Sequence, residues 1–171
     1  MDANFLLNES LPLDMQDGKH LVFQLGEGGY GIPILEVSEI NGLMAITPIP
    51  KTPKYIKGVI NLRGKIIPVM DLRLKFDMPE KEYDERTCII IVSTSVGSSK
   101  KQIGIVVDVV SEVFDIPLSE IEAPPQYGTH CEEDFLNGIG KVKGQVVMLL
   151  NIEKVVYSED IIKLLDRTDS I

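Results

Sequence analysis

The chain has 171 residues, a formal net charge of −9 at pH 7 and a hydrophobic content of 44%. An acidic chain lacks the clustered Lys and Arg that bind nucleic acid or an anionic membrane surface, so both functions are excluded. Its longest apolar runs have five residues, whereas a membrane-spanning helix needs roughly 20. The first 15 residues contain acids but no Lys or Arg, which argues against a secretory signal and predicts a cytoplasmic protein without direct membrane insertion.

The N-terminal part of the sequence predicts a flexible arm and then a hairpin. Residues 1–18 have no hydrophobic period and are expected to form the arm. A short strand follows over Leu21–Leu25, and Gly26–Gly31 formally matches the dinucleotide motif G-x-G-x-x-G. That motif requires a following helix, but Pro33 stands between branched residues instead. We therefore interpret the glycines as a hairpin loop and not as a nucleotide site.

Two segments of the chain occur twice. Tyr55–Leu72 is repeated without a gap, 80 positions later, by Phe135–Ile152, with matching glycines, apolar residues and a basic residue at the turn. Each copy predicts two strands joined at a tight turn, where glycine reaches positive φ without strain. Gly31–Ile40 is repeated 73 positions later by Gly104–Val113, which ends in the same Val-Ser-Glu exit. The chain therefore contains a duplicated β-unit.

The remaining segments are shorter. A strand is predicted over Thr87–Ser93 and a hairpin loop over Ser93–Lys101. Asp71–Phe76 and Asn151–Val156 are each expected to form a short helical turn. A C-terminal helix is predicted to begin at Ser158, end near Asp166 and pack against a barrel, and its apolar face consists of Ile161, Ile162, Leu164 and Leu165.

Many short strands bounded by Gly or Pro predict a mainly all-β fold. We expect two pseudo-repeated five-stranded SH3-like β-barrels packed side by side, with short helices that include one at the C-terminus. The predicted domain covers 19–157 and consists of subdomains at about 19–76 and 87–157, joined by the charged segment 77–86. Residues 158–171 form the C-terminal helix and tail. Barrels of this size are filled by their own side chains, which predicts no internal pocket.

The sequence contains little that indicates catalysis. His130 and Cys131 are adjacent in a loop, so their side chains point apart and make a poor nucleophile–base pair. Asp71 and Asp108 follow strands, where an aspartate commonly closes a turn through the backbone. Metal sites need more ligands at recognisable spacings. We therefore expect a binding module with no catalytic residues, no metal and no cofactor.

The repeated segments resemble the CheW family of chemotaxis adaptors over residues 20–165. The resemblance is carried by Y-x-x-G-V-I-N-L-R-G-x-I-I-P-V-x-D-L-R at 55–73, Y-G-I-x-I-L-x-V-x-E-I at 30–40 and G-I-V-V-D-x-V-S-E-V at 104–113. Similar segments occur in the regulatory domain of the histidine kinase CheA and in CheV-type proteins. The chain supplies no phospho-acceptor, ATP-binding or receiver domain, so the stand-alone adaptor is the expected form.

The resemblance implies a non-enzymatic adaptor that couples transmembrane chemoreceptors to CheA in arrays at the membrane. It also implies that the receptor's helical hairpin tip, from a methyl-accepting chemotaxis protein, binds in a hydrophobic groove between the subdomains. The regulatory domain of CheA is expected to dock end to end with a barrel. Two alternatives remain open at this point. One is an adaptor of the same fold for a non-chemotactic receptor–kinase system, and the other is a small-ligand-binding or enzymatic β-protein.

Nine residues are candidates for these contacts. Val37 and Val110 occupy equivalent repeat positions and are expected to face each other as walls of the receptor groove. Ile34 and Ile40 extend that wall, and the alternative is that all four residues belong to the barrel core. Glu39 and Arg63 align with family positions that matter for coupling, and an Arg at a hairpin corner can form a bidentate pair with a carboxylate. The alternative for Arg63 is a solvent-facing turn residue with an intramolecular partner such as Glu39. The candidate kinase-binding residues are Ile46, Ile49 and Gly58.

Overall fold

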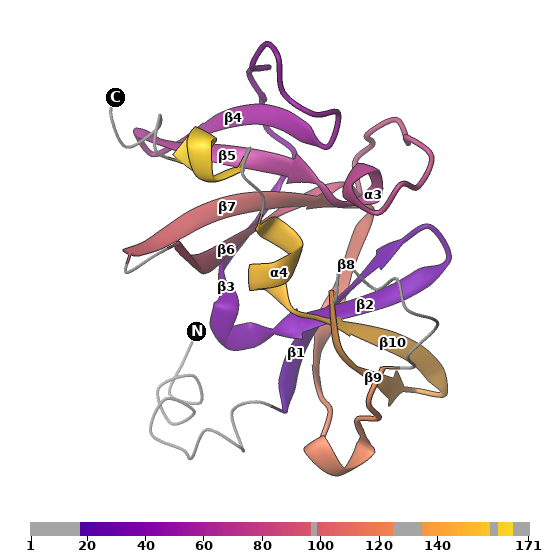
Figure 1. Cartoon of the computed structure of the whole chain (residues 1–171). Helices are drawn as coiled ribbons and strands as arrows, with labels where there is room; N and C mark the ends of the chain where they lie inside the picture. Colours follow the sequence, from indigo (N-terminus) through magenta and orange to yellow (C-terminus); the bar gives the residue numbers. More distant parts are fainter. Residues whose placement is uncertain (1–17, 97–98, 125–134, 158–160, 166–171) are drawn as a thin grey trace.

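Two five-stranded sheets form the molecule. The computed structural model describes residues 18–96, 99–124, 135–157 and 161–165, and in Figure 1 the sheets lie one above the other. Sheet A has the order β8-β1-β2-β10-β9 and consists of Val109–Asp115, Lys19–Leu25, Gly28–Pro33, Gln145–Leu150 and Leu136–Val142. Sheet B has the order β3-β6-β7-β5-β4 and consists of Val37–Gly42, Cys88–Val96, Ser99–Val107, Lys65–Asp71 and Ile56–Leu62. The predicted pair of five-stranded SH3-like units is confirmed.

Each sheet combines strands of both repeats. After β1 and β2, which pair in sheet A, the chain crosses to sheet B, where β3 pairs with β6. After β6 and β7, which pair in sheet B, it crosses back, and β8 pairs with β1. The repeated segments Gly31–Ile40 and Gly104–Val113 contain these two crossovers. The two repeats are therefore related by the same strand order and are interlocked by an exchange of strands.

This exchange corrects the predicted subdomain boundaries. Residues 19–76 contribute β1 and β2 to sheet A and three further strands to sheet B, and residues 87–157 are divided in the same way. The segment 77–86 consequently does not join two separate units. Alignment of the repeats identified equivalent strands correctly, but equivalent strands satisfy the same local pattern whether they pair within a repeat or between repeats.

Three clusters of buried side chains hold the sheets together. A small cluster in sheet B includes Ile60, Val69 and Ile91, and another in sheet A includes Val22 and Leu149. The largest cluster, which we call the shared core, draws residues from both sheets. Its strand members are Leu21, Phe23, Leu25, Ile32, Ile56, Met70, Ile90, Val92, Ile103, Ile105, Val107 and Leu150. Most of the apolar burial therefore lies between the sheets, where it stabilises the folded state in proportion to the area removed from water.

Short helices complete the shared core. α3 (Leu72–Lys75) and α4 (Ile152–Val156) follow the two repeated hairpins, as predicted, and are capped by the side chains of Asp71 and Asn151. Figure 1 shows α4 between the two sheets. Residues 161–165 are helical, and their buried apolar side chains pack into the same core, which confirms the predicted packing of the C-terminal helix. None of the helices within the described residues has the length and apolarity that crossing a bilayer would require.

Each sheet is closed in part by a single backbone bridge. Thr47, in the segment after β3, exchanges two backbone hydrogen bonds of 2.8 and 2.9 Å with Val59 of β4, the opposite edge of sheet B. Glu122 and Ile139 form the equivalent bridge, which joins the segment after β8 to β9 in sheet A. The edges thus come together at one point, without a continuous ladder between the edge strands among the described residues.

Other predictions differ from the structure or lie outside it. The predicted loop Ser93–Lys101 is wrong, because β6 and β7 continue through it and pair Thr94 with Lys101 and Val96 with Ser99. The side chain of Thr94 is buried, which favours a strand at that point in spite of the polar sequence. Residues 1–17, His130, Cys131, the predicted N-cap at 158–160 and the tail 166–171 lie outside the described residues.

Replacing Gly58 with Ala tests the closure of sheet B. Gly58 has φ of +142°, and a Cβ there would lie 1.9 Å from the Thr47 carbonyl oxygen. Backbone strain and overpacking each cost about 1–3 kcal/mol, so the free energy of unfolding should fall by more than about 2 kcal/mol in urea denaturation. Gly42→Ala is the control, since a Cβ on Gly42 meets nothing within 4 Å. Equal stability of the two variants would contradict the role of this bridge.

Candidate partner-binding site

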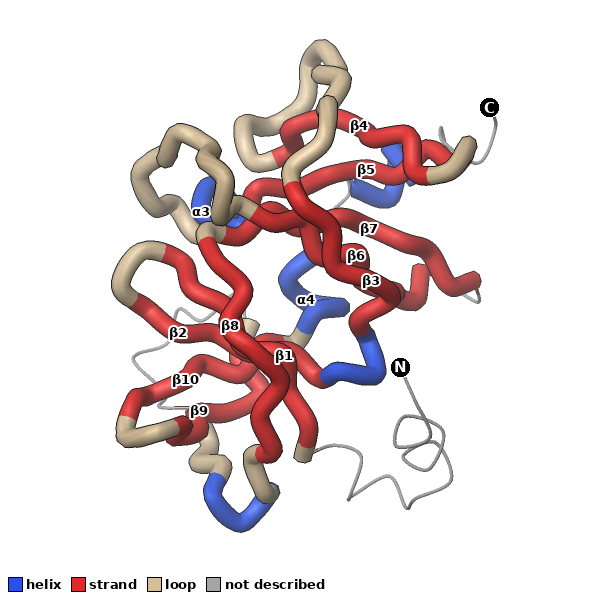
Figure 2. Tube along the Cα trace, turned by 180° about the vertical axis from the view of Figure 1, so that it is seen from behind, coloured by secondary structure: helices blue, strands red, loops and turns tan. Residues whose placement is uncertain are grey.

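Val37 and Val110 approach the same core from different sheets. Val37 is the first residue of β3 and pairs with Val92, whereas Val110 lies on β8 and pairs with Phe23. Both valines are partly buried and pack against the shared core. Figure 2 shows β3 and β8 on the face of the molecule that is turned toward the reader. The two repeat-equivalent residues therefore lie at the seam between the sheets.

Ile34 and Ile40 differ in their exposure. Ile34 lies in the 3-10 helix η1 (Ile34–Glu36) within the crossover, and it packs against the shared core while remaining partly accessible. Ile40 is 42% exposed on β3, and its repeat equivalent on β8, Val113, is 46% exposed. The two edge strands thus each present an apolar side chain to solvent. Ile34 therefore belongs to the edge of the shared core, whereas Ile40 lies on the surface.

Arg63 and Glu39 form a bidentate pair with each other, which is the intramolecular alternative left open by the sequence. The two guanidinium nitrogens donate to the two carboxylate oxygens, with 3.3 Å between Nη1 and Oε2. Arg63 lies at the β4–β5 turn with φ of +52° and is largely exposed. β3 and β4 are opposite edges of sheet B, so this ion pair connects the hairpin turn to the far edge. The pair therefore closes the sheet from one side, while the Thr47–Val59 bridge closes it from the other.

An equivalent ion pair in sheet A was not predicted. Lys143 Nζ, at the β9–β10 turn, lies 3.6 Å from the carboxylate of Glu112 on β8. Lys143 aligns with Arg63, and Glu112 aligns with Glu39, in the two repeats. Combining the two repeat alignments would have predicted this contact from the sequence. Lys provides a single charged donor group and cannot reproduce the planar fork of Arg, so the second pair is less specific in geometry.

The candidate kinase-binding residues belong to one loop and the strand that follows it. Ile46 and Ile49 lie in the segment between β3 and β4, and Gly58 is buried in β4. Ile46 packs against the small core of sheet B, and Ile49 packs against the shared core. Gly58 lies directly against this segment, and its backbone is in contact with Thr47. Its role in binding would consequently be to shape the segment, not to touch a partner.

A surface hollow adjoins this segment. Its volume is about 380 Å³, and it is lined by Leu43, Met44, Ile46, Pro48, Lys54, Ile56, Lys57 and Tyr83. Leu43 is 43% exposed at its edge. The Tyr83 hydroxyl donates to the buried carboxylate of Asp71 over 2.6 Å. The pKa of Tyr83 is raised mainly by burial and to a smaller extent by this hydrogen bond. A hollow lined mainly by apolar residues, together with two lysines, is suited to a protein partner.

A second ion pair that was not predicted joins Arg73 and Asp108. Arg73 of α3 donates from Nη1 to Oδ2 of Asp108 over 2.7 Å, and both side chains are nearly buried. Asp108 was expected to close a local turn. Instead it accepts from Arg73 and from the backbone of Gly26, across 35 and 82 residues of sequence. No local pattern indicates such a contact. Asp71, in contrast, caps α3 by accepting from Leu74 N and closes its own turn as expected.

The ion pair of sheet B predicts a measurable shift in titration. Hydrogen bonds from Arg63, and next from Asn41, hold the pKa of Glu39 below its ordinary 4.5. Because the folded-state pKa is lowered, the stabilising contribution is present above that ordinary value and is lost as the pH falls through the lowered pKa. Arg63→Ala should raise the Glu39 pKa toward 4.5 in an NMR titration of side-chain carboxyl groups, whereas Lys143→Ala should leave it unchanged. An unaltered Glu39 pKa in Arg63→Ala would contradict the pairing.

Comparison with known proteins agrees with this architecture. Residues 19–160 match the model of the CheW-like domain. The chain is 40% identical to the chemotaxis protein CheW of Klebsiella aerogenes over 140 residues, which cover 82% of each chain. It is 35% identical to the chemotaxis protein CheW of Bacillus subtilis over 134 residues, which cover 78% of this chain and 81% of the other.

A solved structure extends the similarity to three dimensions. The scaffolding protein TtCheW of Thermoanaerobacter tengcongensis superposes with a TM-score of 0.73 at 35% identity, over 84% of this chain and 90% of the other. Sequence, domain model and fold thus agree over the two interlocked sheets. The chain belongs to the CheW family of chemotaxis adaptor and scaffolding proteins.

Proposed function

We propose that the protein is a non-enzymatic adaptor that couples transmembrane chemoreceptors to the histidine kinase CheA. The observation that carries this proposal is the position of Val37 and Val110, which come from different sheets and border the same apolar core. A helix from a partner needs apolar contacts on both of its flanks, and a seam between two sheets offers them. The receptor's helical tip is the partner proposed for this seam.

A separate surface is proposed for the kinase. The segment that contains Ile46 and Ile49, together with the hollow beside it, lies on sheet B. Val37 and Ile40 lie within β3, which ends just before this segment. Two separate surfaces would allow one adaptor to bind receptor and kinase at the same time. Binding of both partners would recruit the adaptor to receptor arrays at the membrane.

Reconstitution of kinase activity tests the coupling function. CheA autophosphorylation is measured with a receptor signalling fragment assembled on a template, with and without this protein. We expect stimulation only when receptor, kinase and adaptor are all present, because neither surface alone connects the two partners. Stimulation that does not require the protein, or no stimulation by cognate partners, would contradict the proposal.

Substitution of two exposed residues tests whether the receptor and kinase surfaces are distinct. Ile40 and Leu43 are exposed to nearly the same extent, at 42% and 43%, so replacing either with Glu should leave the fold intact. Ile40→Glu should weaken binding of the receptor fragment about tenfold and leave binding of the kinase regulatory domain unchanged, and Leu43→Glu should do the reverse. A loss of that size corresponds to about 1.4 kcal/mol of binding free energy. Isothermal titration calorimetry measures both affinities.

Val146→Glu is the matched control, since Val146 is 50% exposed on β10 in sheet A and belongs to neither surface. Val37→Glu and Val110→Glu should weaken receptor binding further, provided that thermal unfolding shows an intact fold. If Ile40→Glu and Leu43→Glu reduce both affinities equally, the assignment of two separate surfaces is wrong.

A further inference from the structure

The ion pair between Arg73 and Asp108 connects three segments that belong to different parts of the fold. Arg73 lies in α3, which follows β5 of sheet B, and Asp108 lies at the crossover between β7 and β8. Gly26, in the β1–β2 turn of sheet A, donates its backbone N–H to the same Oδ2 of Asp108 over 2.7 Å. Arg73 also donates from Nε to the Pro79 carbonyl over 3.0 Å. The pair therefore holds the two sheets together where the chain passes from one to the other.

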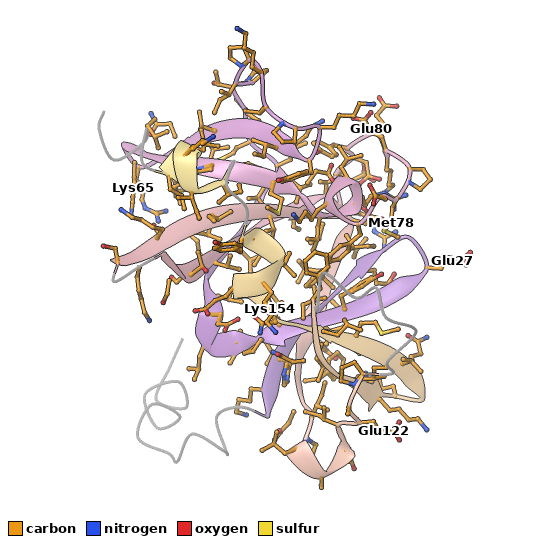
Figure 3. All side chains as sticks on the ribbon, viewed as in Figure 1. Glu27, Lys65, Met78, Glu80, Glu122 and Lys154 are labelled. Carbon is orange, nitrogen blue, oxygen red and sulfur yellow. The ribbon has the colours of Figure 1, made fainter. Side chains whose placement is uncertain are left out.

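The surroundings of this pair restrict its movement. Arg73 and Asp108 expose only 14% and 12% of their side chains. The Sδ-methyl end of Met78 is close to the position that a Cβ on Gly26 would occupy, at 3.6 Å. Figure 3 shows Met78 and Glu27, the neighbour of Gly26, on the same side of the molecule. A charge-assisted hydrogen bond in such a site is shorter and stronger than a neutral one, and it fixes the geometry of the groups it joins.

The repeats show that the fold does not require this pair. The residue equivalent to Arg73 is Glu153, and the residue equivalent to Asp108 is Leu35, which is 45% exposed. The crossover from β2 to β3 has the same topology as the crossover from β7 to β8, but it is built without the ion pair. A feature that is present at only one of two equivalent positions calls for an explanation specific to that position.

Asp108 immediately precedes β8, which contains Val110. Its backbone N–H donates to the Gln24 carbonyl over 3.1 Å, and the next pairs along the strands are Gln24 with Val109 and Phe23 with Val110. Beyond Phe23 the register of β1 and β8 shifts. The regular pairing at this end of β8 is thus confined to a few residues next to Asp108. Fixing Asp108 fixes the start of the strand that carries Val110.

We propose that Arg73 and Asp108 are positioning residues for receptor binding, which hold the start of β8 so that Val110 stands opposite Val37 across the seam. This inference rests on the proposed function of the seam. The kinase surface is proposed on the segment between β3 and β4, whereas the ion pair joins α3 to the crossover between β7 and β8. Removing the ion pair should therefore change the affinity for receptor selectively.

The test uses the full chain and a double variant. Removing one partner leaves a buried unpaired charge, so Arg73→Leu or Asp108→Leu alone should lower Tm. Replacing both with Leu removes both charges, and such replacements often restore stability. The double variant should fold with a Tm near that of the wild type, yet bind the receptor fragment at least tenfold more weakly. Its affinity for the kinase regulatory domain should stay within twofold of the wild-type value.

Hydrogen exchange gives a second readout that does not depend on partners. In the double variant, the amides of β8 near Val110 should exchange faster, while those of β3 near Val37 should not change. Lys65→Met with Gln102→Leu is the control, because it removes an exposed side-chain hydrogen bond of 3.0 Å between the ends of β5 and β7 that lie opposite to Arg73 and Asp108. This control should leave the receptor affinity unaltered.

The outcomes are distinct. If the wild type binds receptor and the double variant binds equally well, the positioning role is overturned and the proposed function stands. If the double variant loses receptor and kinase affinity together, the ion pair maintains the fold in general, and the positioning role is overturned as well. If the wild type itself does not bind the receptor fragment, the proposed function and this inference both fail.

Discussion

The exchange of strands between the two repeats is the constraint on which the rest of the structure depends. Sheet A cannot be completed without β8, and sheet B cannot be completed without β3, because each of these edge strands pairs with a strand of the other repeat. The exchange places both crossovers at the seam between the sheets. It also explains why the largest cluster of buried side chains lies between the sheets and contains strands of both. The seam is thus a product of the topology, and not a contact between two finished domains.

The same exchange accounts for the position of the candidate receptor site. β3 and β8 each begin directly after a crossover, so their first residues lie where one sheet gives way to the other. Val37 is the first residue of β3, and Val110 is the second residue of β8. Their partly buried side chains reach the shared core while part of their surface remains accessible. Under the proposed function, these two equivalent positions form the two walls of one site.

Local features of the fold could be predicted from the sequence. The hairpins, the short helices after them and the contact of Arg63 with Glu39 follow from turn glycines, capping residues and repeat alignment. Features that depend on the choice between equivalent partners could not. Strand exchange leaves every local pattern unchanged, and the contact of Arg73 with Asp108 joins residues with no periodic relation. The extension of β6 and β7 was not predicted, because the Ser and Lys residues at the end of this hairpin have the composition of a loop.

The order of the strands also has a consequence for how the chain acquires its structure during synthesis. β1 and β2 leave the ribosome early, but their neighbours β8 and β10 are encoded after residue 108. Until those neighbours emerge, the apolar face of the first hairpin has no sheet to complete. Contacts between distant parts of a sequence slow folding, because loop closure precedes the gain from packing. A nascent chain of this kind therefore has to keep its first strands from aggregating until nearly the whole domain has been translated.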